Sequence, residues 1–248
     1  DHRNDTQTQA EVWSEFISRH DNQSTQRNLE LFNETLTAMT GTDLYGANSV
    51  IMSFDRYTLN ALQEDTVCPD MLQHQGQIMT ILGNHAKSFT YLLASLRNGQ
   101  IQKSAGNYKI PLLVLMLNIN IAHLYQDATL FMRLWMRLLM TWSSRLLRVY
   151  SNLSPEYGIC KRLALEGLHA IVIDRKLESG HEKLEQALHL AKQHGLTSDE
   201  AILAEYLANL ALERNHISLA IGPLAIARSA YKRWGLTLKV HQIDTLLN

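Results

Sequence analysis

The stretch LEQALHLAKQHG (Leu184–Gly195) recurs 40 residues later, without a gap, as LAIARSAYKRWG (Leu224–Gly235). Four residue types stand at equivalent positions in the two copies: Leu184 and Leu224, Ala187 and Ala227, Lys192 and Lys232, and Gly195 and Gly235. Apolar residues recur at helical spacing in both copies, and a glycine directly after a helix suits a left-handed C-terminal cap. The repeat therefore predicts two equivalent helices that each end at a glycine.

A further helical segment precedes each copy. Residues 161–176 and 198–214 both have helical spacing, and small residues such as Ala164 and Ala204 stand at equivalent positions. A helix pair that recurs about every 34–40 residues, with small residues where the helices cross, is typical of tetratricopeptide (TPR)-like repeats. The sequence thus predicts an all-α fold, a TPR-like α-solenoid of antiparallel helix pairs, over residues 101–248. The full TPR consensus is missing, so the repeat is a loose variant.

Residues 1–100 contain helical patterns but no copy of the repeat, and we expect them to form an N-terminal helical cap or small bundle. Helical spacing occurs there at 8–17, 25–39, 50–63 and 71–96, the last as one helix or as two broken near Gly83. The segment EDTVCPD (64–70) contains a proline and predicts a loop. The polar segment 97–109 predicts a long loop or a domain boundary, and helical spacing then returns at 111–125 and 128–150.

Composition excludes several classes of protein. The 248 residues include only 12 Gly and 4 Pro, fewer than a β-sandwich needs for its turns. The formal net charge is -1, which gives no basic field for nucleic acid. The longest apolar run, Ile110–Leu117, is far shorter than the roughly 20 residues of a membrane helix, so we expect no membrane insertion. Two cysteines make no disulfide framework, which favours a cytoplasmic protein.

Enzyme signatures are missing from the sequence: it contains no phosphate-binding glycine loop, no nucleophile elbow and no kinase motif set. We therefore expect a protein that is not an enzyme and needs no cofactor. Glu166 and His169 form a Glu-x-x-His pair on one helix face, as in di-iron bundles, but a second such motif is lacking because Glu185 and His189 are spaced differently. Structural histidines are favoured over a metal site. Cys160 lies near a helix start beside two cations, and we interpret it as a buried or incidental thiol.

The segment LFMRLWMRLLMTWSSRLLRVY (Leu130–Tyr150) predicts a helix with two distinct faces. At about 100° per residue its four arginines lie within about 120° of one another, and Trp135 and Trp142 point to the opposite side. The arginine face is either the solvated side of a core helix, a docking surface for an acidic or phosphorylated partner, or a membrane-surface helix. The candidate partner-binding residues are Arg133, Arg137, Arg145 and Arg148, with Tyr206 and Asn209 on the inner helix of the last repeat.

About the last 70 residues resemble a known family. The residues that carry the resemblance form a Tyr-x-x-Trp-Gly-x-x-x-Lys-Val pattern: Tyr231, Trp234, Gly235, Lys239 and Val240. The segment is similar to the helical-repeat region of large multidomain signalling kinases. In those proteins a serine/threonine-kinase-like domain and an ATPase precede the repeats, and a GAF domain and a histidine kinase follow. A helical domain attached to a response-regulator receiver, as in a two-component system, fits equally well.

The resemblance implies a non-catalytic protein-interaction and regulatory domain of a signal-transduction protein. Its partners would be attached or separate signalling domains, and formation of a homo-oligomer stays open. Because the chain begins with Asp rather than Met, we expect it to be part of a longer protein whose other domains hold any catalysis. The alternatives are a ligand-sensing helical-repeat domain of a transcription activator and a helical metal-binding enzyme.

Overall fold

Helices make up all the regular structure in the part of the chain described by the computed structural model, which covers residues 34, 37, 69–97, 109–153 and 155–247. The elements are α4 (Pro69–Ile81), α5 (His85–Arg97), α7 (Lys109–Leu124), α8 (Leu130–Leu153), α9 (Pro155–Val172), α10 (Leu177–Gln193), α11 (Thr197–Leu212), α12 (Ile217–Trp234) and α13 (Thr237–Leu247). The prediction of an all-α fold is confirmed for these residues. The helices predicted at 8–17, 25–39 and 50–63 lie outside them, apart from Glu34 and Thr37, which are helical.

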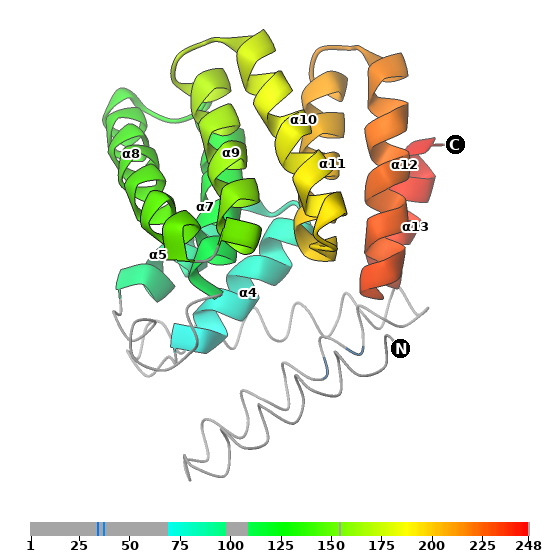
Figure 1. Cartoon of the computed structure of the whole chain (residues 1–248), viewed down its shortest axis with the longest axis horizontal. Helices are drawn as coiled ribbons and strands as arrows, with labels where there is room; N and C mark the ends of the chain where they lie inside the picture. The colour runs from blue at the N-terminus through cyan, green and yellow to red at the C-terminus, as the bar shows by residue number, and fades with distance from the viewer. Residues whose placement is uncertain (1–33, 35–36, 38–68, 98–108, 154, 248) are drawn as a thin grey trace, which may run out of the picture.

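Helices α8 to α12 stand side by side in chain order, and α7 lies behind α9 (Figure 1). The connections α7–α8, α9–α10 and α11–α12 all lie at the same end of the molecule, at the top of Figure 1. The closest packing joins α9 to α10 and α11 to α12, while α7 contacts α4, α5, α8 and α9. This arrangement brings three turns from distant parts of the sequence to one end of the molecule.

The backbone repeats with the 40-residue spacing seen in the sequence. Helix α10 begins at Leu177 and α12 begins at Ile217. Residues in the left-handed region occur at equivalent positions before and after these helices: Arg175 (φ 58°) and Asn215 (φ 60°), and Gly195 (φ 67°) and Gly235 (φ 85°). The two predicted glycine caps are confirmed, and a left-handed residue also occurs after α9 and after α11, where it is not a glycine.

Two apolar clusters form the core and join α4 and α5 to the repeats. Leu92 of α5 belongs to one cluster with residues of α7, α9, α10 and α11. Leu72 of α4 and Tyr91 of α5 belong to the other, together with residues of α11, α12 and α13. Residues 69–97 therefore pack into the same core as the helices of the repeat region.

Several local predictions can be compared with the structure. The 71–96 segment is two helices that break at Gly83, where φ is 80°. The prediction of a loop over 64–70 is wrong for its last two residues, because Pro69 and Asp70 begin α4. Proline is tolerated in the first turn of a helix. Tyr231 is fully buried and stacks on Trp234 at 6.1 Å between ring centroids, so both side chains pack where α12 ends.

Candidate interaction surface and adjoining cavity

Helix α8 lies at the edge of the helical row and buries a narrow stripe. Met136, Met140, Ser143 and Leu147 face the core and are almost completely buried. Trp135 is half-buried against Phe89, with their rings edge to face. The described helices include none that is long and apolar enough to cross a membrane.

The outward side of α8 carries large apolar residues that remain exposed. We call these five residues the α8 stripe: Phe131, Leu134, Leu138, Trp142 and Val149. Phe131 is 80% exposed and Leu138 62%. Their spacing of three, four or seven residues places them on one side of a helix. Of the alternatives for this helix, the one in which the side opposite the arginines faces the core does not hold for Trp142, since this residue is 46% exposed.

The four arginines of α8 divide into two pairs with different surroundings. Arg133 donates hydrogen bonds to the carbonyl oxygens of Tyr125 and Gln126, and Arg137 donates one to the Tyr125 hydroxyl at 2.7 Å. These two arginines hold the α7–α8 turn. Arg145 and Arg148 are exposed, and neither has a hydrogen bond or ion pair from its side chain within the described part of the chain.

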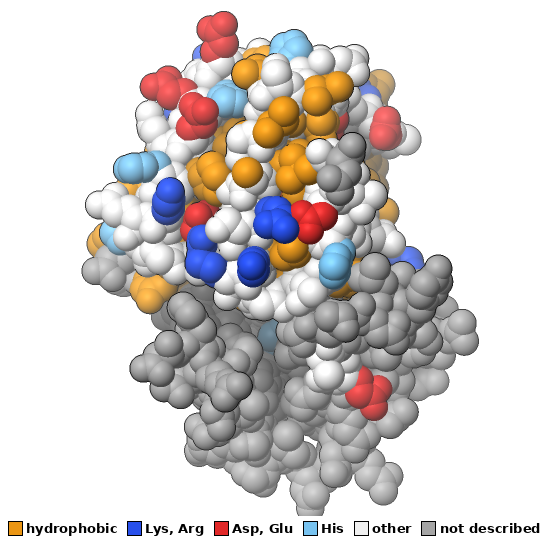
Figure 2. All heavy atoms as spheres, turned by 90° about the vertical axis from the view of Figure 1, so that its right-hand side faces the viewer, with side chains coloured by type: hydrophobic (Ala, Val, Ile, Leu, Met, Phe, Trp, Pro, Cys, Tyr) orange, Lys and Arg blue, Asp and Glu red, His pale blue; other side chains and the backbone are white. Residues whose placement is uncertain are grey.

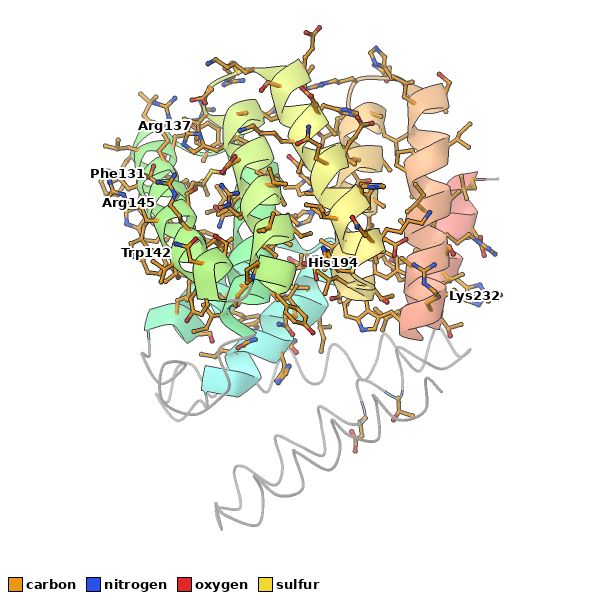
Figure 3. The ribbon with its side chains drawn as sticks, viewed as in Figure 1. Phe131, Arg137, Trp142, Arg145, His194 and Lys232 are labelled. Carbon is orange, nitrogen blue, oxygen red and sulfur yellow. The ribbon has the colours of Figure 1, made fainter. Side chains whose placement is uncertain are left out.

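The α8 segment contains no Asp or Glu, so its four positive charges are not balanced within the helix. Figure 3 shows Arg137 and Arg145 on the same outer side as Phe131 and Trp142. The opposite end of the row, formed by α12 and α13, is different: basic, acidic and apolar side chains are mixed there (Figure 2), and Arg228 pairs with Asp244. The α8 surface is thus both apolar and positively charged.

A cavity of about 470 Å³ lies at the end of the molecule where the three turns meet. Its wall comes from the C-terminal ends of α7, α9 and α11, the turns that follow them, and the start of α10. The lining residues are Ala122, His123, Tyr125, Gln126, Asp127, Ile171, Val172, Arg175, Leu177, Tyr206, Leu210, Glu213 and Arg214. Tyr125 and Gln126 also accept hydrogen bonds from α8, so this cavity adjoins the N-terminal part of that helix.

The two candidate contact residues on α11 do not lie on an open surface. Tyr206 is 6% exposed and lines the large cavity as well as a smaller one of about 30 Å³. Asn209 is half-buried and lines the smaller one. The structure therefore places Tyr206 and Asn209 at cavities and not on the exposed outer side of α8.

Two histidines stack between these cavities. The rings of His85 and His123 are parallel with centroids 3.9 Å apart, and Tyr206 meets His123 edge-on. The Asn120 amide nitrogen donates to the Met116 carbonyl oxygen, so its amide oxygen accepts from His85 Nδ1 at 2.8 Å. Burial, and then the neighbouring His85, lower the pKa of His123 from 6.5 to about 4. Burial also lowers the pKa of His85, against the effect of its hydrogen bond to Asn120.

Stability should fall between pH 7 and pH 5 through His123. Its pKa is lower in the folded state, so the unfolded chain binds more protons as the pH falls from about 6.5 towards 4. About 2 kcal/mol of unfolding free energy should be lost at pH 5 through His123, and His123→Phe should lack this part of the loss while the part that comes from His85 remains. Urea unfolding of both proteins at the two pH values measures the difference. His194→Gln, which changes an exposed histidine remote from α8 (Figure 3), should behave like the unchanged protein.

Glu166 and His169, the two residues of the Glu-x-x-His motif, each contact charged residues other than one another. Glu166 forms ion pairs with Arg162 and Lys183, both at 3.0 Å, and His169 lies 3.6 Å from Asp174. The described residues contain no group of three or more His, Cys, Asp or Glu side chains that could hold a metal. The two members of the motif thus have separate partners.

Cys160 is buried, as the sequence interpretation proposed. Its thiol donates to the Ala187 carbonyl oxygen at 3.2 Å, and burial, followed by the charge of Asp199, raises its pKa to about 12. The thiol is therefore protonated at neutral pH, which does not suit a nucleophile.

Comparison with known proteins found no matching family model, no matching curated protein and no matching solved structure.

Proposed function

We propose that this chain is a non-catalytic protein-interaction and regulatory domain of a signal-transduction protein, built as a solenoid of TPR-like helix pairs. The α8 stripe and the arginines around it would bind an acidic amphipathic helix of the partner. The 40-residue spacing of left-handed turns and helix starts supports the repeat architecture. The kinase-type assignment rests on the sequence pattern around Tyr231 and Trp234.

The observation that carries the proposal is an exposed apolar stripe on a helix with four positive charges and no negative ones. Large apolar surfaces on monomeric proteins commonly mark interaction sites. Tryptophan and arginine are also enriched among residues that dominate binding energy, and Trp142 lies beside Arg145 on this side of α8. A partner helix with leucines on one side and glutamates at its edges would match both properties.

Charge distinguishes this partner from a second copy of the chain. If two α8 helices packed together through the stripe, Arg145 and Arg148 of one would approach the same residues of the other, with no carboxylate in either helix. Such like-charge contacts oppose association. An acidic partner removes the repulsion and gains charge-assisted contacts.

The double substitution Arg145→Glu/Arg148→Glu should weaken binding to an acidic amphipathic helix by about tenfold or more. The free energy of unfolding should change by about 0.5 kcal/mol or less, because both side chains are exposed and bind nothing else in the described residues. The probe is a labelled synthetic helix with a leucine stripe and glutamates elsewhere, followed by fluorescence anisotropy. Arg133 and Arg137 suit this test less well because they hold the α7–α8 turn.

The matched control is Lys192→Glu/Lys232→Glu, which makes the same change in net charge at exposed positions away from α8. It should leave binding nearly unchanged. Equal weakening by both double variants would show that net charge alone controls binding and would contradict the proposal. Binding of the chain to anionic vesicles but not to the acidic helix would instead identify α8 as a membrane-surface helix.

A photoreactive residue in place of Leu138 extends the test to the source cells. We expect this residue to cross-link the chain to its partner protein. The cross-linked product should disappear when the chain also carries Arg145→Glu/Arg148→Glu. The same residue in place of exposed Gln186 on α10 should give no such product. Cross-links that survive the charge reversal would count against an acidic partner.

A further inference from the structure

Arg175 occupies a backbone position that suits glycine. Four turns of the repeat region place a residue in the left-handed region, and the other three residues are Gly195, Asn215 and Gly235. Glycine and asparagine adopt this conformation readily, whereas a residue such as arginine does so at a cost. Unfavourable backbone conformations that persist are found preferentially at functional sites.

Arg175 lines the large cavity, as does Arg214. Both side chains are exposed at its rim, and neither has a hydrogen bond or an ion pair with any residue of the described ranges. The two guanidinium groups come from equivalent turns, after α9 and after α11. Two free guanidinium groups at one rim can bind a carboxylate through several N–H donors.

The rim also carries negative charge. Asp127 and Glu213 line the same cavity and are exposed. The C-terminal ends of α7, α9 and α11 point to it, and helix C-termini carry partial negative charge. A cationic group such as an ammonium is therefore favoured beside these carboxylates. The cavity presents both signs of charge.

The floor of the cavity is apolar with one free hydroxyl. Val172, Leu210 and Tyr206 line it and are buried. The Tyr206 side chain is more than nine-tenths buried. Its hydroxyl has no hydrogen-bond partner in the part of the chain that the structure describes, so it can bond to a ligand or to water that enters the cavity.

We propose that this cavity binds a small zwitterion with an apolar body, such as an apolar amino acid or a short peptide. The carboxylate contacts Arg175 and Arg214, the ammonium lies towards Asp127 and Glu213, and the apolar side chains rest on Val172 and Leu210. The volume of about 470 Å³ lies within the range of small-molecule sites. This site goes beyond the proposed function and does not depend on it.

The test is isothermal titration calorimetry of the full chain with the dipeptide Leu-Leu. We expect saturable binding with a dissociation constant of about 1 mM or lower. Leu-Leu amide, which lacks the carboxylate, and acetyl-Leu-Leu, which lacks the ammonium, should each bind at least about tenfold more weakly. No binding of Leu-Leu, or equal binding of either analogue, would overturn the proposal.

Arg175→Gly separates the ligand role from a structural one. This change removes the guanidinium and relieves the backbone, so the dipeptide should bind about tenfold more weakly while the melting temperature rises by about 2–4 °C. Asn215→Gly, at the equivalent turn outside the cavity lining, should leave dipeptide binding unchanged. Unchanged binding in Arg175→Gly would overturn the assignment of this arginine.

Discussion

Replacement of Lys161 with alanine is expected to lower the free energy of unfolding by about 3–5 kcal/mol. Lys161 Nζ lies 2.8 Å from Asp199 Oδ1, and both side chains are only 4% exposed. The pair joins the second turn of α9 to the start of α11. Removal of Lys161 leaves a buried carboxylate without its counter-ion, and this uncompensated charge is the source of the large effect.

Urea unfolding followed by circular dichroism measures this loss. Arg162→Ala is the matched control, because its ion pair with Glu166 is about one-third exposed on each side and should contribute less than about 1 kcal/mol. The double variant Lys161→Met/Asp199→Leu should recover much of the stability, since it removes both charges and refills the space. A loss below about 1 kcal/mol for Lys161→Ala would mean that water reaches Asp199 at little cost.

The sequence predicted the all-α class and the two glycine-capped helix ends because these signals are local. The 40-residue spacing, the glycines after α10 and α12, and the alanines at the helix crossings all act within neighbouring helices. Gly195 and Gly235 have the predicted left-handed conformation. Ala187 and Ala227 are fully buried, as expected where helices cross.

The orientation of α8 was not predictable from its own pattern. A helical projection assumes that the most apolar side faces the core, and here both sides of α8 are apolar. The core takes Met136, Met140 and Leu147, while Phe131 and Leu138 stay exposed. Which side is buried depends on α7 and α9, whose positions the α8 sequence does not contain.

The cavity and the buried charges depend on contacts between distant segments. His85 and His123 stack across two helices, and Lys161 meets Asp199 across two others. No local spacing connects these residues. One signal was available for Arg175: it aligns with Asn215 at the 40-residue offset, and asparagine at a helix end suggests a left-handed turn.

Gly167→Val is expected to destabilise the fold by about 3 kcal/mol or more. A Cβ atom at Gly167 would lie 2.8 Å from the Gly180 carbonyl oxygen and 2.9 Å from Leu184 Cγ. The opposing Gly180 is equally restricted, because its Cβ would lie 2.4 Å from Ile171 Cγ1. The backbones of α9 and α10 therefore touch at a pair of glycines, and any side chain there must push the helices apart.

Gly222→Val in α12 is the matched control, because apart from its chain neighbours a Cβ atom at Gly222 would meet nothing within 4 Å. This exposed helical site should change the free energy of unfolding by less than about 1 kcal/mol, because the better helix propensity of valine is opposed by crowding against the following Pro223. Valine at Gly167 improves helix propensity but worsens the packing between α9 and α10. Urea unfolding of the two variants therefore shows how much of the loss at Gly167 comes from packing. Equal and small effects would show that α9 and α10 can move apart freely. A large loss confined to Gly167 would show that close helix contact holds the α9–α10 turn, and with it Arg175, in place.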